Sequence, residues 1–452
     1  MYREVIRNLL HNLGGRAEVD RYLSEYTGSA RYAIVKVGGG LIEDDLEELT
    51  SALVFMHHVG LTPVVVHGAG PQLTQELAES NIESQFIDGF RVTTPQVLSA
   101  AQRVFQRVGA QLADAIDARG VRARPLNMGV FLAEQSSNQA LGHVGEITNI
   151  LTESIHRASE QGQLPILSPV GTNEFGQLMN INADTATRAL AIELNASKII
   201  YLTPTGGILD PDGKIIPAVN CSEDLEPMLE SDVVSGGMAR KLIEIGDLLK
   251  ELDEHASVSI TSPSRIAREL FTHRGSGTLV RRGRPIRMMT GIDGLDHHRI
   301  VALLEQSFGR KLKPEYLDTL NNAKVYIGGD YAAIAVLKHN NSGWYLDKLG
   351  LSDRAQGIGL GASLWNRINR DHPCLFWRSR ATNVANKWYL NRADGMHRAG
   401  EWIVFWYGIQ SREHTESCIA DALLLDHSFG ELINKPDSTL EVKSSKESIH
   451  AG

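Results

Sequence analysis

Ala33-Ile34-Val35-Lys36-Val37-Gly38-Gly39-Gly40 runs from an apolar strand directly into a bare glycine turn. A second segment, Val64-Val65-Val66-His67-Gly68-Ala69-Gly70-Pro71, repeats this pattern. Glycines at a strand-to-helix turn let backbone N–H groups approach an anion, and the helix N-terminus adds partial positive charge. A third glycine segment of different pattern, Arg354-Ala355-Gln356-Gly357-Ile358-Gly359-Leu360-Gly361, opens a helix far along the chain. Two kinds of phosphate-binding turn predict two active centres.

The length and composition set the class of protein. The chain of 452 residues is long enough for two domains, and its hydrophobic fraction of 42% is that of an ordinary globular protein. No apolar run approaches the ~20 residues of a membrane helix. The net charge of −9 would repel a nucleic-acid backbone, so local cations and backbone amides must hold any phosphate. The N-terminus lacks a signal-peptide pattern, and Cys221, Cys374 and Cys418 show no metal-ligand spacing. We therefore expect a cytoplasmic enzyme with no nucleic-acid or membrane partner and no metal held by protein side chains.

The pattern along the chain predicts four parts. Residues 1–30 read as a helical arm, because apolar residues recur at spacings of three and four. Residues 31–284 alternate strands and helices, which predicts an α/β domain of three layers with a mostly parallel sheet. Residues 285–435 predict a smaller α+β domain, and residues 436–452 a polar tail. The expected strands of the first domain are Ala33–Val37, Thr62–His67, Ile166–Pro169, Lys198–Thr203 and Val258–Thr261, and its expected helices are Leu46–His58, Pro95–Ala118, Thr185–Glu193 and Ala239–Glu251.

Two lysines of the first domain stand beside glycine turns. Phosphoryl transfer to a carboxylate spreads negative charge over the transferred group, and lysines and glycine amides must neutralise it. Lys36 ends a strand just before three glycines, and Lys241 lies one helical turn beyond Gly236-Gly237. Two lysines that face one pocket repel each other, so we expect an acidic residue between them, with Asp184 as the candidate. His67, at a strand end, is expected to be structural.

Seven motifs in order resemble the amino acid kinase family, specifically N-acetylglutamate kinase. Besides the first two glycine turns, they are Asp88-Gly89-Phe90-Arg91-Val92-Thr93, Gly142-His143-Val144-Gly145-Glu146-Ile147, 180–184, 237–241 and 275–278. The resemblance implies that Lys36 and Lys241 stabilise the transferring phosphoryl group and that Asp184 positions them. It also implies an acetylglutamate site of Gly39, Ala69, Gly70, Arg91 and Asn180, and a site for ATP with Mg²⁺ of Lys36, Gly38, Thr203, Gly206, Gly207, Ile208 and Lys241. Ala69 and Pro204 depart from the family's usual glycine and aspartate.

The third glycine segment resembles the turn by which GNAT acetyltransferases hold the pyrophosphate of acetyl-CoA. Leu375-Phe376-Trp377-Arg378-Ser379-Arg380, Thr382-Asn383 and Asn386-Lys387-Trp388-Tyr389 extend the likeness to the acetyltransferase domain of vertebrate-like N-acetylglutamate synthases, over residues 290–415. By this resemblance Tyr389 donates a hydrogen to the departing thiolate. Glutamate is expected at Lys348, Arg378, Arg380, Asn383 and Asn391, and acetyl-CoA at Leu349, Leu351, Arg354, Gln356, Gly357, Gly359 and Gly361. Arg378 and Arg380 alternate along a strand, which puts both on one face.

Three functional hypotheses follow. The first is a bifunctional enzyme of arginine biosynthesis that acetylates L-glutamate and then phosphorylates N-acetylglutamate. The second is a monofunctional synthase with a regulatory kinase-like half, and the third is an arginine sensor with little catalysis. The stretch 270–278 resembles the effector site of arginine-sensitive kinases, which makes L-arginine a candidate inhibitor at Gly275, Gly277 and Thr278. The family also implies a homo-oligomer of even number, built through the kinase domains.

Overall fold

The structure is a computed structural model. It describes residues 2–14, 16, 19–20, 23, 32–231, 233–234, 236–272, 275–352, 355 and 359–432. The contacts divide the chain into two compact units, the first comprising Met1–Pro285 and Gln356–Ser363 and the second Ile286–Ala355 and Leu364–Gly452. Within the described residues, no helix is long and apolar enough to span a membrane.

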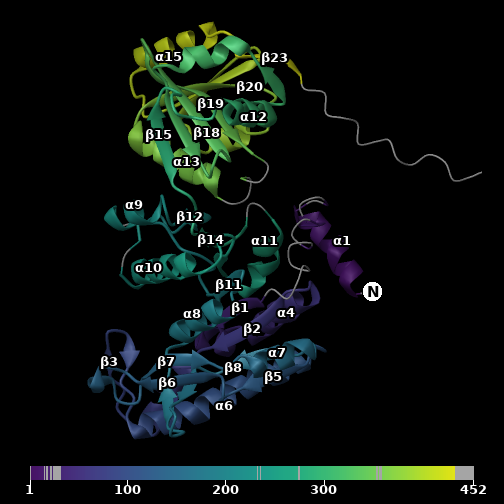
Figure 1. Cartoon of the computed structure of the whole chain (residues 1–452), viewed down its shortest axis with the longest axis vertical. Coiled ribbons are helices and arrows are strands. Elements are labelled where there is room, and N and C mark those ends of the chain that lie inside the picture. The colour runs from purple at the N-terminus through teal and green to yellow at the C-terminus, as the bar shows by residue number, and fades with distance from the viewer. Residues whose placement is uncertain are drawn as a thin grey trace, which may run out of the picture. The chain divides into compact units, whose positions relative to one another are not determined.

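An eight-stranded sheet runs through the first unit in the order β12-β14-β13-β11-β1-β2-β8-β5 (Figure 1). All neighbouring strands are parallel except β13 and β14. The predicted, mostly parallel α/β fold is therefore confirmed. The strands are β1 (Tyr32–Val37), β2 (Thr62–His67), β5 (Ala123–Leu126), β8 (Leu164–Leu167), β11 (Lys198–Leu202), β12 (Ala218–Asn220), β13 (Ser257–Thr261) and β14 (Thr278–Arg281).

Successive residues of β1 enter two different cores. Ala33, Val35 and Val37 belong to one apolar cluster, whereas Tyr32 and Ile34 belong to another. Side chains alternate across a strand, so the two clusters mark the two faces of the sheet. One face is covered by α3 (Gly39–Asp44), α4 (Leu46–His58), α5 (Gly70–Glu79), α6 (Pro95–Asp117) and α11 (Ile266–Phe271), the other by α7 (Glu153–Glu160), α8 (Ala183–Glu193), α9 (Leu225–Glu230) and α10 (Gly236–Glu251).

Short elements that the sequence did not predict complete the first unit. A second sheet has the order β10-β9-β6-β7, and β3 pairs with β4 as a small hairpin. Four of these strands, β3, β4, β9 and β10, have only two or three residues, which is too few for an alternating pattern to be read from sequence. The bounds of the strands are β3 (Phe86–Ile87), β4 (Phe90–Arg91), β6 (Phe131–Gln135), β7 (Gly145–Ile150), β9 (Val170–Thr172) and β10 (Leu178–Asn180), with single 3₁₀ turns at Gln139–Leu141 and Pro263–Arg265. In the expected N-terminal arm, α1 covers Tyr2–Gly14, and most of 15–31 lies outside the described residues.

The second unit is built on a seven-stranded sheet of order β15-β17-β18-β19-β20-β22-β21. Only β19 and β20 are parallel, and their register covers just Tyr345 with Phe376 and Leu346 with Trp377. Beyond these pairs the two strands part. The elements are β15 (Ile286–Thr290), β17 (Lys324–Gly328), β18 (Ala333–Asn340), β19 (Gly343–Leu351), β20 (Leu375–Arg380), β21 (Gly395–Ala399), β22 (Trp402–Tyr407), the pair β16 (Arg310–Leu312) and β23 (Phe429–Leu432), α12 (His297–Phe308), α13 (Leu360–Asp371), α14 (Asn386–Leu390), α15 (Arg412–Leu424) and the 3₁₀ segment Pro314–Leu320.

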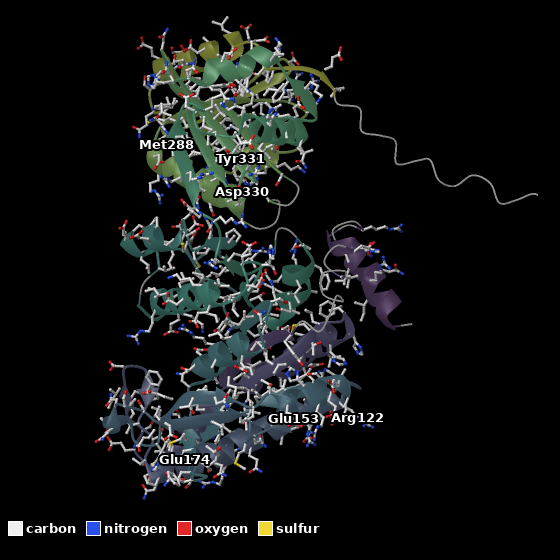
Figure 2. All side chains as sticks on the ribbon, in the orientation of Figure 1. Arg122, Glu153, Glu174, Met288, Asp330 and Tyr331 are labelled. Carbon is white, nitrogen blue, oxygen red and sulfur yellow. The ribbon has the colours of Figure 1, made fainter. Side chains whose placement is uncertain are left out.

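The turn between β17 and β18 holds two non-glycine residues in the left-handed region, Asp330 with φ 53° and Tyr331 with φ 64° (Figure 2). Such residues cost about 1–3 kcal/mol each, so neighbouring contacts must hold them. Arg299 forms an ion pair with Asp330 at 2.9 Å and stacks over the Tyr331 ring. The turn lies against the end of β19, since the Ser352 N–H donates to the Ala332 carbonyl at 2.9 Å.

Candidate active sites

Two lysines of the first unit converge on one carboxylate. Lys36 Nζ lies 3.1 Å from Asp184 Oδ1, and Lys241 Nζ lies 3.6 Å from Asp184 Oδ2. This is the arrangement expected from repulsion between two cations that face one pocket. A carboxylate between two ammonium groups fixes their spacing and leaves one net positive charge for a polyanionic ligand.

Different elements position the three charges. Lys36 lies at the end of β1, in register with Tyr201 of β11. Asp184 follows the N-cap Asn182, whose side chain accepts the N–H of Asp184 at 2.8 Å. An acidic residue in the first turn of a helix is stabilised by the helix dipole. Lys241 lies on α10, and its ammonium sits 4.6 Å from the centre of the Tyr201 ring. The strand, the helix start and the aromatic face together define one site.

The charges shift one another's pKa. Burial alone would raise the pKa of Asp184, but Lys36 and Lys241 outweigh burial and lower it. Burial lowers the pKa of Lys241, against the opposing attraction of Asp184 and with the repulsion of Lys36. The carboxylate therefore remains charged at neutral pH, and the charge of Lys241 depends on it.

The glycine turns beside these charges are open on one side. A Cβ on Gly38 or Gly70 would meet nothing within 4 Å, whereas one on Gly39 would lie 2.5 Å from Gln72 Oε1. Gly38 and Gly70 thus face space that a ligand can enter, and Gly39 is needed for close packing. Ala69 has φ −146°, outside the left-handed region that favours glycine. Its departure from the family pattern therefore carries no conformational strain of that kind.

Hydrogen bonds connect Arg91 of β4 with Asn180 of β10. Arg91 donates to Thr74 Oγ1 at 2.8 Å and to the Gly70 carbonyl at 3.3 Å, and it stacks over Phe86. Asn180 donates to Thr93 Oγ1 at 3.0 Å, and Thr93 Oγ1 donates to the Arg91 carbonyl at 2.9 Å. Burial lowers the pKa of Arg91. The chain of bonds links these two predicted acetylglutamate residues through Thr93, which the sequence analysis did not assign to a site.

The predicted nucleotide turn is tied to β14. Gly206 has φ 73°, which favours glycine, and a Cβ on Gly207 would lie 2.7 Å from Ile215. The Ile208 N–H donates to Thr278 Oγ1 at 2.8 Å, and Thr278 Oγ1 donates to the Ile216 carbonyl at 2.6 Å. Thr278 was predicted as an effector residue, and here its hydroxyl bonds within the fold. It connects the nucleotide turn to the start of β14 and to Ile216, just before β12.

Glu269 organises the predicted effector segment, and sequence reading missed it. This buried carboxylate accepts the N–H groups of Ser276 and Gly277, each at 2.9 Å, and the hydroxyl of Ser259 at 3.0 Å. A Cβ on Gly277 would lie 2.2 Å from the Ile260 carbonyl oxygen. Gly275 has φ 55°. An acidic residue next to Leu270 and Phe271 was the available signal, because a carboxylate inside an apolar helix needs specific donors.

In the second unit, Tyr389 lies in an aromatic cluster on the α13 face of the sheet. Its ring is 5.4 Å from Trp377 and 5.6 Å from Phe405 between centroids, and Trp365 of α13 is 6.3 Å away. Burial raises the pKa of Tyr389, so its hydroxyl stays protonated. The hydroxyl has no hydrogen-bond partner among the described residues. It is a proton donor without an internal acceptor.

The predicted glutamate cations lie on the α15 face, and the structure already gives them partners. Lys348 forms an ion pair with Asp347 at 2.6 Å and donates to Ser428 Oγ at 3.0 Å. Asp347 also pairs with Lys338 at 3.1 Å. Arg378 donates to the carbonyls of Ala422 and Asp426, each at 2.9 Å, and Arg380 pairs with Glu401 at 2.5 Å. Both arginines stack over Trp402, as their shared strand face predicts.

The remaining predicted residues of the acetyltransferase site belong to several separate segments of the chain. Leu349 and Leu351 lie on the part of β19 that has no β20 partner in the register. Asn383 bonds Ser379 at 2.9 Å and accepts the Ala385 N–H, and Asn391 is exposed after α14. Gly359, with φ 81°, and Gly361 are described, but Arg354, Gln356 and Gly357 lie outside the described residues.

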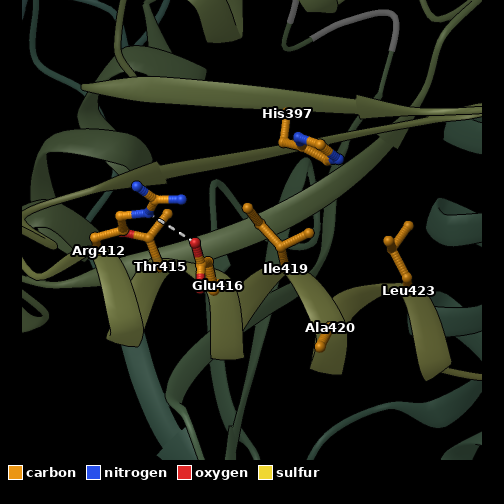
Figure 3. A pocket seen from close by; sticks show the side chains of 7 residues that line it. All are labelled: His397, Arg412, Thr415, Glu416, Ile419, Ala420 and Leu423. Atoms are coloured by element: carbon orange, nitrogen blue, oxygen red, sulfur yellow. Dashed lines mark hydrogen bonds and ion pairs between the residues drawn. The ribbon is translucent and has the colours of Figure 1, made fainter.

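A surface groove in the second unit holds none of these residues. It lies between edge strand β21 and α15, where His397 faces the helix and Arg412 pairs with Glu416 at 2.8 Å (Figure 3). Ile419, Ala420 and Leu423 form its apolar floor.

Comparisons with known proteins match both units. The model of the amino acid kinase family covers residues 31–260, and that of NAT, the N-acetyltransferase of N-acetylglutamate synthase, covers residues 287–423. An acetylglutamate kinase of Xanthomonas campestris pv. campestris is 42% identical over 410 residues, which cover 89% of this chain and 96% of that protein. The mitochondrial N-acetylglutamate synthase of Homo sapiens is 30% identical over 414 residues, covering 90% of this chain and 74% of that protein.

A solved structure shares the fold. The N-acetylglutamate synthase of Neisseria gonorrhoeae, in complex with coenzyme A and N-acetylglutamate, aligns with a TM-score of 0.57 at 20% identity. The alignment covers 86% of this chain and 98% of that one.

Proposed function

We propose that one polypeptide catalyses two consecutive reactions. The premise is that the chain belongs to the amino acid kinase family and joins its kinase domain to an acetyltransferase domain of N-acetylglutamate synthase. The chain is a kinase and an acetyltransferase of arginine biosynthesis. In the proposed sequence, acetyl-CoA and L-glutamate give N-acetylglutamate and CoA. N-acetylglutamate and ATP then give N-acetylglutamyl 5-phosphate and ADP.

The observation that carries the kinase reaction is the Lys36–Asp184–Lys241 triad. A γ-carboxylate oxygen of N-acetylglutamate attacks the γ-phosphorus of ATP, and the bond from that phosphorus to the β,γ-bridging oxygen breaks. Lys36 and Lys241 flank the point where negative charge develops, and Asp184 holds them. Arg91, Asn180 and the amides of Gly39, Ala69 and Gly70 are the proposed acetylglutamate contacts.

The nucleotide is assigned to the turn at residues 203–208 and to Gly38. The open space at Gly38 and the positive φ of Gly206 suit a backbone that approaches phosphate closely. Among the described residues, no cluster of three His, Cys, Asp or Glu could hold a metal ion. Mg²⁺ would therefore be held chiefly by the phosphate oxygens of ATP, where it offsets their charge.

For acetyl transfer, the neutral amine of glutamate attacks the thioester carbonyl and the carbon–sulfur bond breaks. The nitrogen loses one proton, and the departing CoA thiolate gains one. The free edge of β19 at Leu349 and Leu351 offers backbone groups to the peptide-like arm of CoA, with the turn at 354–361 proposed for its pyrophosphate. Tyr389 donates a hydrogen bond to the departing thiolate. Arg380, Asn383 and Asn391 are the proposed direct contacts of glutamate. Lys348 and Arg378, which already have internal partners, are proposed to act on glutamate through their positive charge.

We further propose inhibition by L-arginine at 270–278. Its support is the Glu269 network, which binds the N–H groups of Ser276 and the predicted effector residue Gly277, and the bond from the Ile208 N–H to Thr278. A homo-oligomer of even number and a cytoplasmic location belong to the same proposal, the latter because Cys221, Cys374 and Cys418 are free thiols.

Two assays on the full-length protein test the two reactions. ADP release is measured with N-acetylglutamate, ATP and Mg²⁺, and CoA release with glutamate and acetyl-CoA, for wild type, Lys241→Ala and Tyr389→Phe. We expect each substitution to abolish chiefly one activity, so that each variant serves as the folding control of the other. Wild type without ADP release would favour the monofunctional synthase, and absence of both activities would favour the arginine sensor.

A further inference from the structure

A buried polar chain joins the ends of three neighbouring strands of the kinase sheet. His67 is the last residue of β2, Ser168 follows β8, and Asn127 follows β5. His67 Nε2 lies 3.1 Å from Ser168 Oγ, and the Ser168 hydroxyl donates to Asn127 Oδ1 at 3.0 Å. The three strands are parallel and adjacent, so the chain lies along the carboxyl edge of the sheet, where α/β proteins bind their ligands.

Each group of this chain has a fixed hydrogen-bonding role. Burial lowers the pKa of His67 to about 4, so the imidazole is neutral at physiological pH and carries one N–H. Because Ser168 donates its only hydroxyl proton to Asn127, it accepts from His67, which places the imidazole proton on Nε2. His67 and Ser168 are 0% and 1% exposed, so solvent does not reach either side chain. A buried polar chain of this kind is stable only while every link is kept.

Helix α6 closes over the chain. A Cβ on Gly109 of this helix would lie 3.2 Å from both His67 Nε2 and Asn127 Oδ1. Phe105, one turn earlier, packs edge-on against the imidazole with 6.0 Å between the ring centroids. Gly109 therefore allows the helix backbone to approach closely, and the imidazole has little space in which to rotate. Packing as well as hydrogen bonding thus sets the direction of the bond from His67 to Ser168.

The two ends of this bond lead to two parts of the proposed acetylglutamate site. On one side, His67 directly precedes the turn at 68–70, whose backbone is proposed to contact the substrate. On the other side, the Val170 N–H donates to the Ser168 carbonyl at 2.9 Å, and Val170 of β9 pairs with Asn180 of β10. The bond between His67 and Ser168 therefore ties the turn to the strand pair that carries Asn180.

We propose that His67 is a positioning residue for N-acetylglutamate, acting through Ser168 to hold the turn at 68–70 in a fixed place relative to Asn180. The inference rests on the proposed kinase reaction and adds to it a fully buried residue that touches no substrate. The nucleotide turn at 203–208 follows β11, which is separated from β2 by β1, and the polar chain extends from β2 in the opposite direction. Loss of the chain should therefore weaken the binding of N-acetylglutamate and spare that of ADP.

Calorimetry on the full-length protein tests this role, with N-acetylglutamate and ADP as separate ligands. Ser168→Ala removes the acceptor and His67→Asn removes the donor at Nε2, whereas the longer side chain of His67→Gln places an amide N–H near that position. We expect the first two variants to weaken N-acetylglutamate binding about tenfold and to keep ADP binding within about twofold. His67→Gln should recover most of the affinity. In the kinase assay, the KM for N-acetylglutamate should rise in the same order with kcat nearly unchanged.

Thr50→Val is the matched control. The buried Thr50 hydroxyl donates to the Leu46 carbonyl within α4, so this substitution removes a buried hydrogen bond elsewhere in the same unit. It should leave the affinity for both ligands unchanged, even where the Tm falls. Retained ADP binding shows that the kinase unit of each variant is folded.

Three results would overturn the proposal. The first is an unchanged affinity for N-acetylglutamate in both Ser168→Ala and His67→Asn, and the second is an equal weakening of both ligands. The third is a His67→Gln variant that binds N-acetylglutamate no better than His67→Asn does. A wild type that binds N-acetylglutamate but releases no ADP would reject the proposed reaction alone, because binding decides the role of His67.

Discussion

Asp184→Asn removes one charge from the kinase triad while keeping the shape of the side chain. At an effective dielectric constant of about 20, ion pairs of 3.1 and 3.6 Å each attract by about 5 kcal/mol before the cost of desolvation. The Asp184 side chain is 36% exposed, so water and desolvation offset most of that attraction. What remains is the positioning of Lys36 and Lys241 in the transition state. The loss of one such stabilising group costs about 100- to 1,000-fold in kcat.

The pH profile of the Asp184→Asn variant gives a second readout. Burial and Lys36 already lower the pKa of Lys241, and Asp184 opposes them. Without the carboxylate this pKa falls further, and a lysine loses its charge as pH rises through its pKa. We therefore expect the alkaline limb of ADP release to move to lower pH. The acetyltransferase activity of the same variant is the control. A variant that keeps kcat within threefold of wild type, with an unshifted alkaline limb, would refute the reasoning.

Three other substitutions test the networks around the sites. Gly277→Ala places a Cβ 2.2 Å from a carbonyl oxygen and should lower Tm by several degrees in a thermal melt. Gly237→Ala is the control, because its Cβ would meet nothing within 4 Å, and it should leave Tm nearly unchanged. Equal Tm values for the two variants would contradict the role of Gly277 in close packing. Glu269→Gln leaves two backbone N–H groups with a weaker acceptor and should raise the arginine concentration that halves ADP release, a shift whose absence would argue against an effector site here. Asp347→Asn removes the carboxylate that opposes the lowering of the Lys348 pKa by burial, Lys338 and Arg378. The KM for glutamate should then rise with pH above neutrality, and a pH-independent KM would show that the charge of Lys348 plays no part in glutamate binding.

The sequence predicted the elements of this fold that have a clear apolar pattern. The strand Thr62–His67 and the helix Leu46–His58 match their predicted bounds, because a continuous apolar run marks the strand and a helical apolar period marks the helix. The Lys36–Asp184–Lys241 cluster was predicted because mutual repulsion demands an intervening acid. The hydrogen bonds that Thr278 and Lys348 make inside the fold could not be predicted from the sequence, since their partners lie up to 80 residues away.

The register of β1 has a consequence for how the enzyme loses activity. Lys36 lies on a strand bonded on both sides, to β11 and β2, in the middle of an eight-stranded sheet. Amides of such strands exchange hydrogen only through openings that approach global unfolding. Lys36 is thus anchored in the slowest-exchanging part of the kinase unit. Heat inactivation of phosphoryl transfer should then coincide with loss of the sheet, with no earlier loss of the reactive lysine's position.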